Sequence, residues 1–141
     1  MQKLYFPELP QLRDYTVRWS RRRQKRVLAT CNISRLIVSV AKELSYPDRI
    51  EWLEPLLYHE MCHAVLKPQS LRHRGRTRWH GPEFRALERR HPKIAELDRW
   101  IAEGGWRAAV RQARARQSVQ RRTAKNSTQS VPINIAIGED R

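Results

Sequence analysis

The chain has 141 residues, enough for one domain with tails and a single sizeable core. Its 29 lysine and arginine residues against 14 aspartate and glutamate residues give a formal net charge of +15 at pH 7. Such an excess favours polyanionic partners such as nucleic acid, through phosphate contacts and counterion release. With only two cysteines, Cys31 and Cys62, the sequence excludes a disulfide framework and a four-cysteine zinc ribbon.

The amino terminus does not resemble a signal for export. Pro7, Glu8 and Pro10 stand where a signal peptide would need an apolar run. No later stretch approaches the roughly 18 apolar residues that a membrane span requires. We therefore expect a cytoplasmic protein with reduced thiols and no membrane partner.

The first predicted elements are strands. Residues 15–20, YTVRWS, alternate large apolar and polar side chains, and β-branched residues are frequent in 27–34, VLATCNIS, and in 35–40, RLIVSV. These runs are too short for convincing helices. The sequence therefore predicts a small N-terminal β-sheet.

A helix is predicted next, over residues 56–66. Asp48 followed by Glu51 resembles a capping box, whereas Pro55 implies that the helix either bends there or begins near it. Pro68 is expected to end it. Apolar side chains surround most of this helix, so it should be buried, and its ionisable residues then need partners.

Three further helices are predicted after an irregular basic loop at residues 67–79. The first begins at Pro82, with Gly81 as its cap, and ends near Arg90. The second ends at the Gly-Gly pair that begins at Gly104. The third follows at once and fades into a polar, basic stretch that should be disordered.

Together these elements predict an α+β domain over residues 1–110 and a basic, flexible tail over residues 111–141. Many cations lie close together in this tail, which favours contact with nucleic acid. The arginines concerned are Arg111, Arg114, Arg116, Arg121 and Arg122.

Residues 58–66, YHEMCHAVL, contain the pattern that points to chemistry. Positions four apart share one helix face, so His59 and His63 can aim two imidazole nitrogens at one point. A catalytic zinc site uses three protein ligands and leaves a fourth position for water. Glu60, about 100° around the helix from His59, could accept a proton from that water. This HExxH pattern is typical of metalloproteases, and two packed core histidines are the alternative.

A third ligand must come from elsewhere in the chain. A metzincin continuation is excluded, since Leu66 and Gln69 occupy the positions of its glycine and histidine. His80 is the preferred candidate because it stands just before a helix start, after a loop long enough to fold back over the first helix. Cys62 points away from the His59 face and should be a core residue. The downstream candidates are His73, His80, His91, Glu83 and Glu88.

The segment HEMCHA, followed by HGPEF seventeen residues after His63, resembles the SprT-like family, which includes the Spartan proteases that digest proteins crosslinked to DNA. The upstream segment VRWSRRRQKRVLATCNISRLIVSV resembles the same family. The resemblance covers residues 15–90 and implies a zincin-type fold, with zinc held by His59, His63 and His80 and with Glu60 as general base. It also implies that the strand near 35–40 flanks the cleft and pairs with an extended substrate.

The chain departs from this family in two ways: it lacks the cysteines of a C-terminal zinc ribbon, and its tail is short. DNA targeting would then depend on the basic surface and tail. We therefore predict a zinc metalloendopeptidase that acts on DNA-associated or DNA-crosslinked proteins. The alternatives are a nucleic-acid-binding module with structural zinc, or a metal-dependent hydrolase of a small substrate such as a nucleotide.

Overall fold

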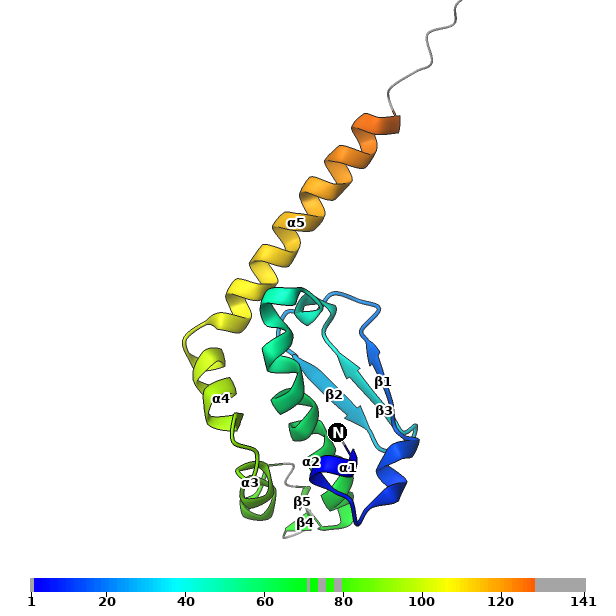
Figure 1. Cartoon of the computed structure of the whole chain (residues 1–141), viewed down its shortest axis with the longest axis vertical. Coiled ribbons are helices and arrows are strands. Elements are labelled where there is room, and N and C mark those ends of the chain that lie inside the picture. The colour runs from blue at the N-terminus through cyan, green and yellow to red at the C-terminus, as the bar shows by residue number, and fades with distance from the viewer. Residues whose placement is uncertain (1, 71, 74–75, 78–79, 129–141) are drawn as a thin grey trace, which may run out of the picture. The chain divides into compact units, whose positions relative to one another are not determined.

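The computed structural model describes residues 2–70, 72–73, 76–77 and 80–128. It is an α+β structure in which a small three-stranded sheet precedes most of the helices (Figure 1). The chain divides into two compact units, Met1–Val110 and Arg111–Arg141. The first unit holds the sheet and the histidines predicted to bind metal.

The sheet is built from the three strands that the sequence predicts. They are β1 (Thr16–Trp19), β2 (Ala29–Asn32) and β3 (Ile37–Val40). β3 lies in the middle, parallel to β1 and antiparallel to β2. Both hydrogen-bonding edges of β3 are therefore occupied, so the prediction that this strand pairs with a substrate is wrong.

The predicted helix is α2 (Leu53–Ser70), which is preceded by the 3-10 helix η3 (Pro47–Trp52). Pro55 lies in the first turn of α2, where backbone N–H groups have no acceptor within the helix, so its missing donor is tolerated. The start near Pro55 is thus confirmed. The predicted capping box is wrong, because Asp48 lies inside η3 and is not the cap of a helix. The prediction that Pro68 ends the helix is wrong, because Pro68 lies within the last turn of α2, which ends two residues later at Ser70.

Two short elements and three helices follow α2. An antiparallel pair, β4 (Arg72–His73) and β5 (Arg76–Thr77), replaces part of the predicted loop, because two-residue strands leave no pattern in a sequence. The smaller helices elsewhere in the chain are α1 (Gln2–Tyr5), η1 (Pro10–Asp14) and η2 (Lys42–Leu44). The later helices are α3 (Pro82–Glu88), α4 (Ile94–Ala102) and α5 (Gly105–Thr128).

The helix boundaries marked by glycine and proline agree with the sequence. Gly81 is the N-cap of α3 and Pro82 is its first residue. Gly104 follows α4 with a φ of +87°, a left-handed conformation that favours glycine. The last helix differs from expectation, since α5 does not fade but extends to Thr128. It contains no proline and is rich in alanine, arginine and glutamine, which are good helix formers.

Two clusters of buried apolar side chains stabilise the first unit. One joins the sheet to α2, α4 and the start of α5, and it includes Val40, Leu56 and Trp106. The other joins α1, η1, α2 and α3 around Tyr58 and Cys62. Cys62 is fully buried, as predicted for a small core residue. Of the helices in the described ranges, none is both long and apolar enough to cross a membrane.

Candidate metal centre

Three histidines, two on α2 and one just before α3, converge at the predicted site. His59 and His63 lie one turn apart on α2, with ring centroids separated by 5.1 Å. His80 lies just before α3, and its ring centroid is 5.2 Å from that of His59 and 5.0 Å from that of His63. One possible ligand atom from each ring lies within 4.8 Å of the others. The structure therefore brings together the three residues that the sequence indicated.

The chemistry of this donor set fits a divalent metal ion. Nitrogen ligands about 2.1 Å from a tetrahedral zinc ion lie about 3.4 Å apart, so small ring rotations would close the set. Burial lowers the pKa of His63 to about 4, assisted by the charges of His59 and His80. Burial also lowers the pKa of His80. Neutral imidazoles are the form that binds metal, so these two rings are ready to do so at neutral pH.

Phe84 on the first turn of α3 packs against all three imidazoles. Its ring centroid is 5.0 Å from that of His59, 4.5 Å from that of His63 and 4.9 Å from that of His80. Its side chain is completely buried. Phe84 therefore holds the three rings from one apolar side, a role that sequence reasoning missed.

Glu88 contacts His59 at Nδ1, one of the two nitrogens of the imidazole ring. Its carboxylate Oε1 lies 2.6 Å from His59 Nδ1, and only 5% of Glu88 is exposed. Burial alone would raise the pKa of Glu88, but the hydrogen bond with His59 and nearby positive charges outweigh it and lower that pKa. A Nδ1–H that donates to this carboxylate leaves Nε2 unprotonated as the metal donor.

Glu88 is one of the candidate third ligands from the sequence, but it is hydrogen-bonded to His59 and does not belong to the converging set of His59, His63 and His80. It follows Phe84 by four residues, so both side chains lie on the face of α3 that meets the histidines. That spacing is the signal by which Phe84 and Glu88 could have been found.

Glu60, the predicted general base, is buried beside the histidines and is only 4% exposed. Burial raises the pKa of its carboxyl to about 7, although the charge of His59 lowers it. The charge of Glu60 also adds to the effect of burial in raising the pKa of the Cys31 thiol on β2 to about 12. β2 therefore lies beside the Glu60 carboxylate, whose pKa of about 7 is that of the metal-free protein.

We expect Glu60→Gln to stabilise the metal-free protein at pH 8. A carboxyl whose pKa rises from 4.5 to about 7 on folding favours the folded state when protonated, and this contribution is lost as the pH rises through 7. Glutamine stays neutral, so the variant should gain about 3 kcal/mol in unfolding free energy at pH 8 and almost nothing at pH 4.5. Urea denaturation in the presence of a chelator measures both values. A variant that is destabilised equally at the two pH values would contradict this assignment.

The other ligand candidates either do not belong to the group of three rings or lie outside the described residues. His91 is buried in the turn before α4, where its Nε2 is 3.1 Å from the Tyr5 hydroxyl and 3.6 Å from the Glu54 carboxylate. Glu83 is exposed on α3. The side chain of His73 lies outside the described residues.

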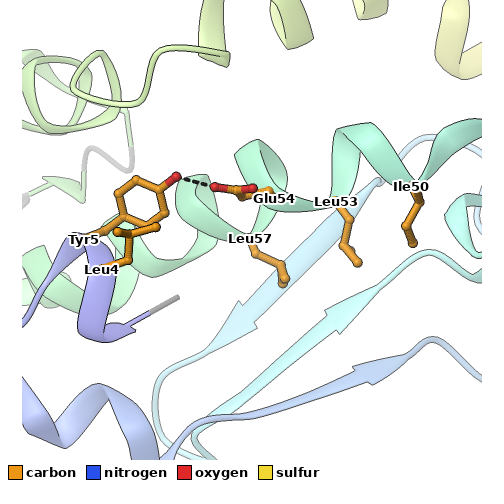
Figure 2. Close-up of a pocket in the computed structure, with 6 residues that line it drawn as sticks. All are labelled: Leu4, Tyr5, Ile50, Leu53, Glu54 and Leu57. Carbon is orange, nitrogen blue, oxygen red and sulfur yellow. Dashed lines mark hydrogen bonds between the residues drawn. The ribbon is translucent and has the colours of Figure 1, made fainter.

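A pocket of about 330 Å³ lies on a different face of α2 (Figure 2). The Tyr5 hydroxyl donates a hydrogen bond to the Glu54 carboxylate at its edge. Leu57 and His59 are two residues apart and point about 200° apart around the helix. The pocket is therefore separate from the histidine site. Its lining residues are Leu4, Tyr5, Ile50, Leu53, Glu54 and Leu57.

The arginines proposed from the sequence to bind nucleic acid all lie on α5, in the second unit. Their side chains are exposed to solvent. They are Arg111, Arg114, Arg116, Arg121 and Arg122.

A family model, described as the SprT-like family, matches residues 1–100 of the 141-residue chain. The matched region contains His59, Glu60, His63 and His80. Comparisons with curated proteins and with solved structures find no match.

Proposed function

The chain belongs to the SprT-like family, whose members have a metalloprotease-type, metal-dependent domain, and from this premise we propose that it is a zinc-dependent metalloendopeptidase. The observation that carries the proposal is the convergence of His59, His63 and His80 beside the buried carboxylate of Glu60. In this proposal residues 1–110 form a zincin-like catalytic domain, and residues 111–141 form a basic tail.

Each residue of the site has a separate task in the proposed reaction. The zinc ion, when bound, polarises the scissile carbonyl and lowers the pKa of a water. The three imidazoles supply its ligands. Glu60 accepts a proton from the attacking water and delivers it to the leaving amine. The positive charge of the ion would lower the pKa of Glu60 below the value of about 7 that burial gives it, which favours the basic form.

The substrate is proposed to lie along β2. Within the described part of the chain β2 pairs only with β3, so its outer edge has no strand partner there, and β2 also contacts α2. An extended polypeptide can add to such an edge through main-chain hydrogen bonds. This position would bring its peptide bonds near Glu60, whose charge acts on Cys31 of β2.

DNA-associated proteins are the proposed substrates. The net charge of +15 favours recruitment to DNA, where proteins bound or crosslinked to it would be cleaved. The location proposed is the cytoplasm, in which the free thiols Cys31 and Cys62 stay reduced. A purely structural zinc would need no buried carboxylate beside it, so Glu60 favours the protease over a binding module.

Glu88 is expected to control metal affinity in this site. We predict that Glu88→Gln weakens zinc binding by about 10- to 100-fold, because the amide no longer offers His59 a charged acceptor. Competition with a chromophoric chelator measures the affinity. Glu83→Gln is the matched control, since it removes an exposed carboxylate from the same helix. Equal zinc affinity in the two variants would show that Glu88 does not orient the ligand.

The proposed function is tested by incubating the zinc-loaded protein with casein and with histone, each with and without DNA. We expect protein fragments that disappear with a chelator and return with zinc, and faster histone cleavage when DNA is present. Release of phosphate from a panel of nucleotides would instead support the small-substrate hydrolase. A zinc-loaded protein that binds DNA but cleaves no protein would contradict the protease.

A further inference from the structure

The second unit carries a one-sided row of cations on α5. Successive residues of a helix are about 100° apart, so five exposed cations fall within an arc of about 100°. We name this set the basic stripe. It consists of Arg111, Arg114, Arg121, Arg122 and Lys125. Arg116 does not belong to it, because it points about 200° away from Arg114.

The sequence around the basic stripe contains no acidic residue. Residues 104–138 contain no aspartate or glutamate. Within the stripe, Arg111 and Arg114 are three residues apart, and Arg121 and Lys125 are four apart, which are spacings at which like charges repel and weaken a helix. An external polyanion would remove this repulsion.

The other side chains of α5 indicate which kind of polyanion the basic stripe can bind. Residues 107–128 contain no aromatic side chain, so this helix lacks the stacking platforms that bind single-stranded nucleic acid. Val119 is the only large aliphatic residue in Arg111–Thr128, so no apolar face is present for insertion into a membrane surface. The stripe therefore suits a rigid polyanion with regularly spaced charges.

We propose that the basic stripe binds the phosphate backbone of duplex DNA, with α5 lying along the major groove. The stripe runs over fifteen residues, from Arg111 to Lys125, a rise of about 21 Å over which each DNA strand presents about six phosphates. The major groove of B-DNA is about 12 Å wide and admits an α-helix, whereas that of an RNA duplex is too narrow. This inference rests on the proposed function, which already involves DNA, and adds the form of DNA that is bound and the surface that binds it.

The test compares two substitutions that remove the same charge from opposite sides of one helix. Arg114→Gln lies in the stripe and Arg116→Gln lies outside it. Because glutamine and arginine have similar helix propensities, neither should unfold α5. The affinity of the zinc-loaded, full-length protein for a 20-base-pair DNA duplex is measured by fluorescence anisotropy over a series of salt concentrations. Binding requires no proteolysis, so failure here is distinguishable from failure of the protease.

We expect Arg114→Gln to weaken duplex binding by about five- to tenfold near 0.1 M salt and to reduce the slope of log affinity against log salt by about one. Arg116→Gln should change the affinity by less than about twofold. The wild-type protein should prefer duplex DNA to a single strand and to an RNA duplex of the same length. Equal losses in the two variants, or tighter binding to either competitor, would overturn the proposal.

Discussion

Glu60→Gln is expected to reduce proteolysis by about 10²- to 10⁴-fold while the protein keeps its zinc. The substitution preserves the shape of the side chain but removes the carboxylate proposed to accept a proton from the attacking water. Zinc should stay bound because Glu60 is not one of the three converging imidazoles. Cleavage of casein gives the rate, and elemental analysis of the same sample gives the zinc content.

The matched control for this substitution is Glu83→Gln, which neutralises an exposed carboxylate near the same site. It should cleave casein at the wild-type rate. A Glu60→Gln protein that retains both zinc and most of its activity would contradict the assigned mechanism. Loss of zinc together with activity would instead mean that Glu60 helps to hold the metal.

His80→Ala is expected to lower zinc affinity by more than about 100-fold, which exceeds the usual cost of removing an outer-shell partner. The substitution removes one of the three proposed ligands and leaves only His59 and His63, both on α2. Because His80 is exposed and lies before the start of α3, the metal-free variant should melt at the wild-type temperature. Zinc affinity is measured by competition with a chelator, and melting by circular dichroism.

His73→Ala provides the comparison, since His73 was an alternative third ligand in the sequence. It should retain wild-type zinc affinity. If His73→Ala loses zinc and His80→Ala does not, the third ligand has been assigned to the wrong residue. A His80→Ala protein that binds zinc as tightly as the wild type would contradict the proposed three-histidine metal centre.

Local signals in the sequence were sufficient for most elements of the fold. The alternation of apolar residues near β1 and the β-branched runs at β2 and β3 predicted three strands correctly. Gly81 and Pro82 marked the start of α3, because cap and first-turn positions have strict backbone requirements. The histidines of α2 were found because helical periodicity fixes which positions share a face.

Features that depend on distant parts of the chain were not predictable in the same way. The order of strands places β3 between β1 and β2, and no local pattern specifies it. The length of α5 was underestimated because its basic composition resembled that of a disordered tail, although its residues favour a helix. Glu88 was recognised as a possible ligand, but its hydrogen bond to His59 depends on how α3 packs against α2.

The central claim is that one zinc ion is held by three imidazoles and keeps a position open to solvent. X-ray absorption at the zinc edge of the zinc-loaded protein tests it most directly. We predict three imidazole nitrogens and one oxygen at about 2.0 to 2.1 Å, with no sulfur. A sulfur ligand from a cysteine, or a zinc ion with four protein ligands, would contradict the account.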